Sequence, residues 1–320
     1  MKKVIFDTDI GIDDAMALLF LHYSPEVELK AIVSGFGNAD IETTTRNALY
    51  MKEHFEIDAP VYRGAAEPIG DRLGHGYPDF VHGDNGLGEI DIHEPTTQVE
   101  SLSGAQAIVD IVRECPQEIS IVAVGRLTNL ALALELCPEL PNLVREVIVM
   151  GGTFGHNGHC GNVSPVAEAN IAGDPQAADK VFASGLTVSI VGLDVTEETI
   201  ANDSFFETLQ ATTGKPGDFI YRISRFYLRF HEQISGAHSC PIHDSSAVAY
   251  LLRPNLYQTK TAAVRVVTTG IAIGQTIAGN PDANFESDAW KNKPVCKICV
   301  GVEPDKVLAL YTNTLALAAE

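Results

Sequence analysis

Short apolar runs alternate along the chain with longer segments of helical periodicity. Residues 4–6 form the first run, the acidic segment 7–14 follows at once, and residues 15–21 have the pattern of a buried helix. The same order recurs to the end of the chain. We expect further strands at 28–35, 60–64, 118–125, 145–150, 186–191, 258–268 and 294–302. We expect helices at 41–54, 104–114, 130–136, 174–184, 245–252 and 303–319, with 197–233 helical and broken near 214–217.

Strands that alternate with helices predict an α/β fold with a mostly parallel, Rossmann-like sheet and helices on both faces. The late strands 258–268 and 294–302 are expected to form an edge of this sheet. The sequence has neither an internal repeat nor a low-complexity linker, so residues 1–320 are interpreted as a single domain.

Four carboxylates follow the first strand within eight residues: Asp7, Asp9, Asp13 and Asp14. In an open α/β sheet, ligands bind outside the carboxyl ends of the strands. Because these carboxylates repel one another, we expect a compensating positive charge, either the N-terminus of the next helix or a hard cation such as Ca²⁺ or Mg²⁺. The simpler alternative, in which Asp13 only caps the helix, accounts for one of the four.

Other polar segments also follow strands and should reach the same rim of the sheet. They contain Asn38, the pair Thr128 and Asn129, and the segment 161–170 with Asn162, Glu168 and Asn170. Amides and carboxylates together suit a ligand with many hydroxyl groups, such as a sugar, although asparagines often bond within their own loop. His243 and Asp244 add an imidazole and a further acid at the start of a helix, and the long loop 64–100 carries His82 in a glycine-rich candidate flap.

The charge balance restricts the partners of the chain. The sequence has 42 Asp+Glu against 22 Lys+Arg, a formal net charge of −20, which disfavours nucleic acid and anionic membranes. No stretch has the roughly 18 apolar residues of a membrane span, and Asp7 and Asp9 interrupt any signal sequence, so we expect a cytoplasmic protein. Six cysteines do not suggest a disulfide framework, and the lone pair Cys296 and Cys299 is interpreted as part of a strand.

Several motifs together resemble the inosine-uridine-type nucleoside hydrolases, from the first strand to the last helix. The strongest are DTDIGIDDA at 7–15, GNVSPVAEANI at 161–171 and PIHDSSAVAY at 241–250, supported by GFGN at 35–38, HGDNGLG at 82–88 and GRLTNLALAL at 125–134. The resemblance implies a calcium-dependent hydrolase that cleaves the N-glycosidic bond of ribonucleosides. It also implies a homo-oligomer, often of four subunits.

The resemblance also implies a role for each motif residue. Asp9, Asp14 and Asp244 would hold Ca²⁺ together with the backbone carbonyl of Thr128, and Asp9 would also be the general base. The ribose hydroxyls and the 5′ end would be bound by Asp13, Asn38, Asn162, Glu168 and Asn170. His243 would lie beside the leaving base, and His82 near the nucleobase. These ligands leave room in a calcium shell of about six to eight oxygens for water and two hydroxyls.

The sequence departs from the resemblance at Arg126, where relatives often have Pro or Ala. The segment 221–233 offers Tyr227, His231 and Gln233 as candidate base contacts, but aromatic residues at helical spacing are also typical of a core. The choice between purine and pyrimidine therefore stays open.

Two other classes of protein remain as alternatives. A haloacid-dehalogenase-like phosphatase would use Mg²⁺, with Asp7 as nucleophile and Asp9 as acid. Gly11 stands where that class has Thr or Val, and the motifs at 161–171 and 241–250 have no role in it; phosphate release would identify it. A non-catalytic nucleoside or sugar sensor would share the fold but would not need Asp9 or His243.

Overall fold

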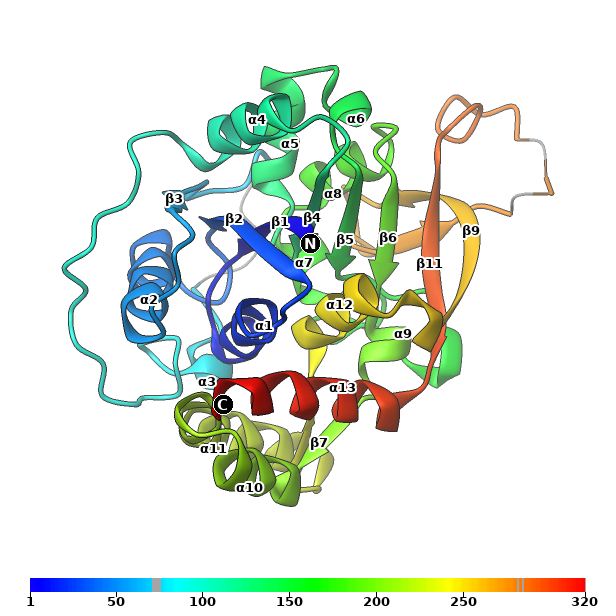
Figure 1. Cartoon of the computed structure of the whole chain (residues 1–320). Helices are drawn as coiled ribbons and strands as arrows, with labels where there is room; N and C mark the ends of the chain where they lie inside the picture. The colour runs from blue at the N-terminus through cyan, green and yellow to red at the C-terminus, as the bar shows by residue number, and fades with distance from the viewer. Residues whose placement is uncertain (71–75, 281, 284, 320) are drawn as a thin grey trace.

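The computed structural model describes residues 1–70, 76–280, 282–283 and 285–319, so segment 71–75 of the expected loop 64–100 and Glu320 lie outside the described residues. The predicted alternation of strands and helices forms a nine-stranded sheet (Figure 1). In spatial order the strands are β10 (Thr276–Ala278), β9 (Tyr257–Val266), β11 (Val295–Val302), β6 (Val188–Val191), β5 (Glu146–Met150), β4 (Ile119–Ala123), β1 (Lys2–Thr8), β2 (Val27–Ser34) and β3 (Val61–Arg63).

The prediction of a mostly parallel sheet is confirmed. In spatial order, the seven strands β11, β6, β5, β4, β1, β2 and β3 run parallel to one another. Strand β9 runs antiparallel to both of its neighbours, β11 and β10. The expectation that 294–302 forms an edge together with 258–268 was wrong, because β11 lies inside the sheet between β6 and β9. The outermost strand on that side is β10, whose three residues are too few to give a periodic signal.

Two apolar clusters cover the two faces of the sheet. Side chains alternate along β1, so Val4 and Phe6 pack into one cluster while Ile5 packs into the other. Helices α1, α2, α11, α12 and α13 contribute to the first cluster and α4, α5 and α8 to the second. The main helices are α1 (Ile12–His22), α2 (Ile41–His54), α4 (Gly104–Glu114), α5 (Thr128–Leu136), α8 (Pro175–Phe182), α10 (Asp203–Thr212), α11 (Lys215–Ser235), α12 (His243–Leu252) and α13 (Pro304–Ala316).

The expected helical region 197–233 needs correction at its start. A short helix α9 (Leu193–Thr196) precedes it, and strand β7 (Ile200–Asn202) pairs antiparallel with β8 (Ser239–Pro241). The helices begin only after Asn202, whose side chain caps α10 by accepting a hydrogen bond from the Phe205 N–H at 3.0 Å. A three-residue strand that leads directly into a helix leaves no room for a period-two pattern.

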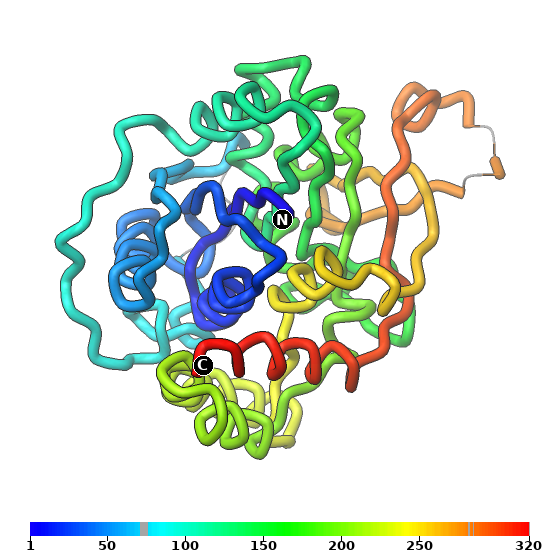
Figure 2. Tube along the Cα trace, in the orientation of Figure 1, coloured from blue at the N-terminus to red at the C-terminus, as the bar shows by residue number. Residues whose placement is uncertain are grey.

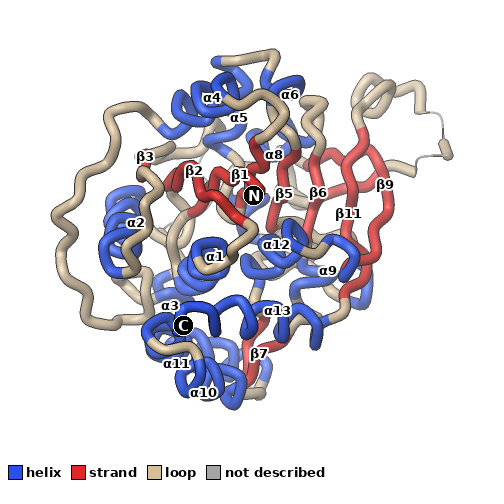
Figure 3. Tube along the Cα trace, in the orientation of Figure 1, coloured by secondary structure: helices blue, strands red, loops and turns tan. Residues whose placement is uncertain are grey.

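The long connection after β3 is mostly irregular, as expected. Its described part contains one turn of helix, α3 (Asp79–His82), and otherwise runs as loop around α2 to α4 (Figure 3). Glu53 on α2 fixes the returning part by accepting backbone hydrogen bonds from Thr96 and Thr97. Two further short helices are α6 (Leu140–Leu143) and α7 (Ala169–Gly173).

The chain ends on the same side of the sheet as α10 and α11. Figure 2 shows the C-terminus next to α11, while the N-terminus begins at the centre of the sheet. Within the described residues, the structure contains no helix with both the length and the apolar character of a membrane span.

Candidate functional site

The turn between β1 and α1 is the centre of the site. Gly11 precedes the helix in extended backbone, and its α-carbon faces two polar side chains. A β-carbon added to Gly11 would lie 2.6 Å from His82 Nδ1 and 2.7 Å from Asn38 Nδ2. The glycine is therefore required by close approach rather than by backbone conformation. It allows the flap helix α3 and the β2–α2 turn to meet at this point.

Asp14 holds the turn together. Its Oδ1 accepts hydrogen bonds from the hydroxyl of Thr8 at 2.6 Å and the backbone N–H of Asp9 at 3.2 Å. Its Oδ2 accepts from the N–H of Gly11 at 2.9 Å and from Asn38 Nδ2 at 2.7 Å. Four hydrogen bonds therefore fix the position of a fully buried carboxylate.

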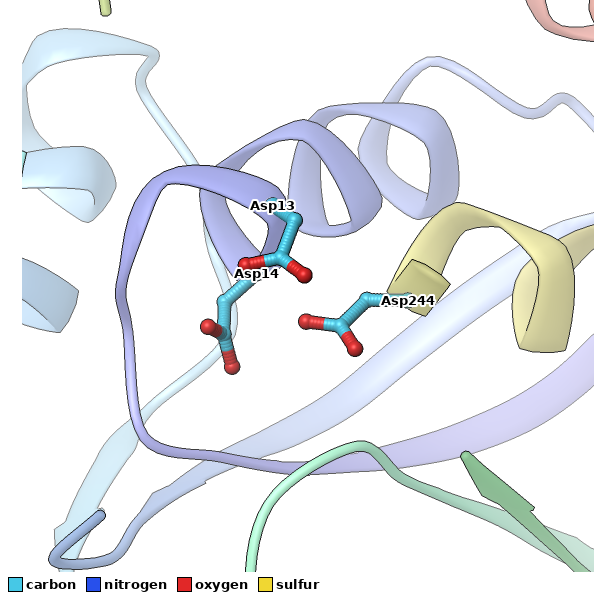
Figure 4. A group of neighbouring side chains, drawn as sticks. All are labelled: Asp13, Asp14 and Asp244. Atoms are coloured by element: carbon cyan, nitrogen blue, oxygen red, sulfur yellow. The ribbon is translucent and has the colours of Figure 1, made fainter. Parts of the chain in front are cut away.

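Asp13, Asp14 and Asp244 converge at the carboxyl ends of the strands. One ligand atom from each lies within 4.8 Å of the others, and all three side chains are buried (Figure 4). Burial, followed by repulsion from Asp14, raises the pKa of Asp13 to about 8, and burial together with Asp13 and Asp14 raises the pKa of Asp244. Asp13 Oδ1 has no hydrogen-bond partner. A set of buried oxygen donors with excess negative charge fits a hard divalent cation.

Asp9 lies beside this group. Its Oδ2 accepts a hydrogen bond from the backbone N–H of Asn38 at 2.8 Å, whereas its Oδ1 is buried without a partner. Gly37 and Gly125 enclose the carboxylate, since a β-carbon on Gly125 would lie 2.6 Å from Asp9 Oδ1. Burial and the nearby Asp14 raise the pKa of Asp9. A carboxylate in this state has a free oxygen for a ligand or a proton.

The segment 161–170 brings its three predicted residues to one place. Glu168 caps α7 and accepts backbone hydrogen bonds from Gly152 at 2.9 Å, Asn170 at 2.9 Å and Ile171 at 3.1 Å. Burial raises its pKa. Asn170 donates to the carbonyl of Val124 at 2.7 Å, and the side chain of the exposed Asn162 accepts from the Ala169 N–H. Glu168 and Asn170 therefore lie at the carboxyl ends of β4 and β5, whereas the hydrogen bond of Asn162 is internal to its loop.

Thr128 is the first residue of α5. Its hydroxyl donates to Asp174 Oδ2 at 2.7 Å, which anchors the start of the helix. In the turn before this helix, Gly125 lies against the Asp9 carboxylate.

Histidines and a tyrosine form the other wall of the site. His82 accepts the N–H of Ile12 at Nδ1, at 3.1 Å, and stacks near Tyr227 with centroids 5.9 Å apart. Tyr227 in turn contacts His231 edge-on at 4.5 Å. Burial lowers the pKa of His82 and of His231 to about 4. The aromatic residues of α11 thus reach the flap, whereas Gln233, the third candidate base contact, is exposed.

His243 lies in the first turn of α12, next to Asp244. Its Nδ1 is 2.8 Å from the hydroxyl of Thr196, which the sequence reasoning did not select. Burial lowers the pKa of His243 to about 3, with further contributions from His231 and His82.

Arg126 has a defined position in the structure. Its guanidinium lies over the Phe36 ring, 4.5 Å from the centroid, and its side chain packs against Gly173 at the end of α7. Its charge lowers the pKa of both Asp9 and Glu168, against the larger effect of burial. The interpretation of Cys296 and Cys299 as strand residues is confirmed, since both are buried in β11 with free thiols.

The fold and the site together define a class of α/β protein with buried carboxylates gathered at the carboxyl ends of its parallel strands. Comparison with known proteins gives the family. The model of the family described as inosine-uridine preferring nucleoside hydrolase matches residues 4–309, and the chain belongs to this family. It is a hydrolase that acts on the N-glycosidic bond of ribonucleosides.

Curated relatives and solved structures agree with this assignment. The chain is 39% identical to uridine nucleosidase 1 of Arabidopsis thaliana over 86% of its length and 81% of the relative's. It is 37% identical to the non-specific ribonucleoside hydrolase RihC of Escherichia coli, over 84% and 86% of the two chains. The plant nucleoside hydrolase PpNRh1 superposes with a TM-score of 0.94 at 36% identity, covering 98% of this chain and 99% of that one. The purine-preferring ribonucleoside hydrolase of Gardnerella vaginalis gives 0.90 at 31% identity, covering 99% of each chain.

Proposed function

We propose that this protein is a single-domain, calcium-dependent ribonucleoside hydrolase in which Asp9 is the general base. The observation that carries the proposal is the convergence of Asp13, Asp14 and Asp244 beside Asp9, with buried carboxylate oxygens that lack partners. Such oxygens cost free energy unless a cation or a donor satisfies them. Oxygen-only ligands with several carboxylates favour Ca²⁺ over softer metals.

Asp9, Asp14 and Asp244 are the proposed carboxylate ligands, completed by a backbone carbonyl. The family resemblance suggested the carbonyl of Thr128. The carbonyl of Thr128 is retained in the proposal, since the nearby Val124 carbonyl already accepts a hydrogen bond from Asn170 at 2.7 Å. Asp13 belongs to the same group, and its Oδ1 is available to a ribose hydroxyl.

The chain's own residues supply the acid–base and electrostatic chemistry. A bound Ca²⁺ makes nearby water more acidic. Asp9 can then accept a proton from the attacking water, since its Oδ1 has no competing donor. The ribosyl carbon develops positive charge as the glycosidic bond breaks, and the carboxylates of Asp9 and Glu168 favour that charge over the neutral ground state.

The remaining residues bind and orient the substrate. Asp13, Asn38, Asn162, Glu168 and Asn170 are proposed to hold the ribose hydroxyls and the 5′ end. His82, His243 and Tyr227 are proposed to enclose the nucleobase, because all three are buried and the rings of His82 and Tyr227 stack with centroids 5.9 Å apart. Orientation of the ribose against Asp9 reduces the entropy that the reaction must otherwise lose.

The substrate range and the biological setting are also proposals. The relatives named above act on uridine, on ribonucleosides without base specificity, or preferentially on purines, which supports uridine and inosine as first substrates. By family resemblance we propose a role in nucleoside salvage or catabolism and a homotetramer. A cytoplasmic location stays a prediction from the sequence, to be tested by cell fractionation.

The decisive experiment measures free ribose from inosine, uridine, cytidine and adenosine. Parallel samples contain a calcium chelator, Asp9→Asn protein, or the control Asp305→Asn, which changes an exposed acid on α13. We expect ribose release that disappears with chelator and falls roughly 10²–10⁴-fold in Asp9→Asn. Tight binding of ribose and Ca²⁺ without turnover would instead support a sensor, and phosphate release from a phosphomonoester would support a phosphatase.

A further inference from the structure

His243 is hydrogen-bonded to Thr196, a residue outside the motifs identified in the sequence. Thr196 is the last residue of α9 and is fully buried, and its hydroxyl lies 2.8 Å from His243 Nδ1. The two residues come from different elements, which pack together after β6 and at the start of α12. The contact therefore fixes the orientation of the imidazole ring relative to the sheet.

The direction of this hydrogen bond follows from the hydroxyl of Thr196. Among the described residues, His243 Nδ1 is its one hydrogen-bond partner. If Nδ1–H were the donor, the buried hydroxyl proton would have no acceptor, which costs free energy. The hydroxyl therefore donates and Nδ1 accepts. An accepting Nδ1 carries no proton, so the ring is neutral and its proton resides on Nε2.

The other ring nitrogen is free to act on a ligand. No described residue forms a hydrogen bond with His243 Nε2, while Asp244 follows directly in the chain. Because Asp244 belongs to the carboxylate group and both His243 and Asp244 lie in the first turn of α12, the imidazole lies at the edge of the same site. An Nε2–H at this edge can donate a hydrogen bond to a nucleobase.

We propose that Thr196 is a positioning residue that locks His243 as the neutral Nε2–H tautomer, so that His243 donates a hydrogen bond to the departing nucleobase. The inference rests on the proposed function for the identity of the ligand. The electron pair of the C1′–N bond passes to the base, the oxygen of water bonds to C1′, and a water proton passes to Asp9. The base leaves as an anion stabilised by the Nε2–H bond and then takes a proton from solvent.

The first test determines the tautomer without any turnover. Nitrogen-15 spectra of histidine-labelled protein, with the His243 signals assigned from His243→Gln protein, distinguish the two neutral tautomers from the imidazolium. We expect Nε2–H in the wild type and in Thr196→Ser, and a mixture in Thr196→Val, which keeps the shape and removes the hydroxyl. Nδ1–H or an imidazolium in the wild type would overturn the proposal.

The second test separates positioning from folding. Thr196→Val should lower kcat on uridine about tenfold or more, consistent with the loss of one proton-donating contact, and Thr196→Ser should restore it. Hydrolysis of 4-nitrophenyl riboside should change little, because its phenolate leaves without such help. Thr199→Val is the matched control, since the hydroxyl of this buried threonine donates to the Val195 carbonyl within its own turn. An equal loss on both substrates would contradict the proposal. If wild-type protein cleaved neither substrate, the proposed function would fail while the tautomer remained measurable.

Discussion

At the scale of single residues, Asn129 joins more of the site than its place in the sequence suggests. Its Nδ2 donates to Asp7 Oδ1 at 2.8 Å and to the carbonyl of Ser34 at 3.1 Å, while its Oδ1 accepts from the Ala65 N–H at 2.8 Å. One amide therefore connects the ends of β1 and β2 with the start of the long loop. Burial raises the pKa of Asp7 to about 7, and the bond from Asn129 opposes this rise.

Asn129→Ala should therefore destabilise the protein strongly. It leaves the buried Asp7 carboxylate and the Ala65 N–H without partners, and we expect a loss of about 2–3 kcal/mol in the free energy of unfolding. Urea titration measures this as a lower midpoint at constant slope. Asn142→Ala, on an exposed side chain of α6, is the control and should change stability by less than about 0.5 kcal/mol. A loss no larger than that of the control would mean that water replaces the amide.

The carboxylates of the site show what the sequence could predict about single residues. Asp9, Asp14, Asp244 and Glu168 were predictable, because carboxylates gathered at the carboxyl ends of strands repel one another and need a compensating charge. The contact between Thr196 and His243 was not predictable, because a hydroxyl acts through its three-dimensional neighbours. Nothing in the spacing of Thr196 and His243, 47 residues apart, indicates that they meet.

At the scale of elements, an ion pair links the antiparallel strand β9 to helix α8. Arg265 on β9 binds Asp179 on α8 through Nε at 2.7 Å and Nη2 at 2.6 Å, and Asp179 also accepts the Val266 N–H at 2.9 Å. Both side chains are about one-fifth exposed. The geometry is specific to a guanidinium, because its planar donors match the two carboxylate oxygens.

Arg265→Lys keeps the charge and removes the paired geometry, so we expect a loss of about 1–2 kcal/mol in stability. Arg253→Lys is a matched comparison, because Arg253 also binds a carboxylate, Glu26, with two nitrogens but is 42% exposed. Solvent screening should limit its loss to below about 1 kcal/mol. Equal losses at the two sites in urea denaturation would show that burial does not strengthen the Arg265 pair.

The elements also show where periodicity stops being informative. The buried parallel strands gave continuous apolar runs and were found, because both faces of each strand are covered. The order of β9, β10 and β11 was not predictable, since an apolar run does not reveal which neighbour it pairs with. The sequence pattern does not distinguish the short strand β7 from the helix that follows, because its last residue, Asn202, is also the cap of α10.

At the scale of the whole molecule, the carboxylate group connects distant parts of the chain. Asp13 and Asp14 come from α1, near the N-terminus, and Asp244 from α12, more than two hundred residues later. The helices α1 and α12 pack against each other beside the sheet. Without a counter-ion, repulsion among these carboxylates opposes this packing, in a protein whose net charge is already −20.

Ca²⁺ should therefore stabilise the entire fold rather than only the local turn. A ligand that binds the folded state alone adds about 2.7 kcal/mol at a hundredfold excess over its Kd, so the Tm should rise by a few degrees and continue to rise with concentration. Mg²⁺ should have a smaller effect, because it requires shorter bonds and a near-octahedral shell. The carboxylate oxygens of Asp13, Asp14 and Asp244, which lie within 4.8 Å of one another, suit the longer bonds of Ca²⁺ better. Asp244→Asn should remove most of the Ca²⁺ effect, and the exposed control Asp305→Asn should keep it. A Tm that is independent of Ca²⁺ in the wild type would contradict the proposed calcium site, since the buried oxygens of Asp9 and Asp13 would then be tolerated without a cation.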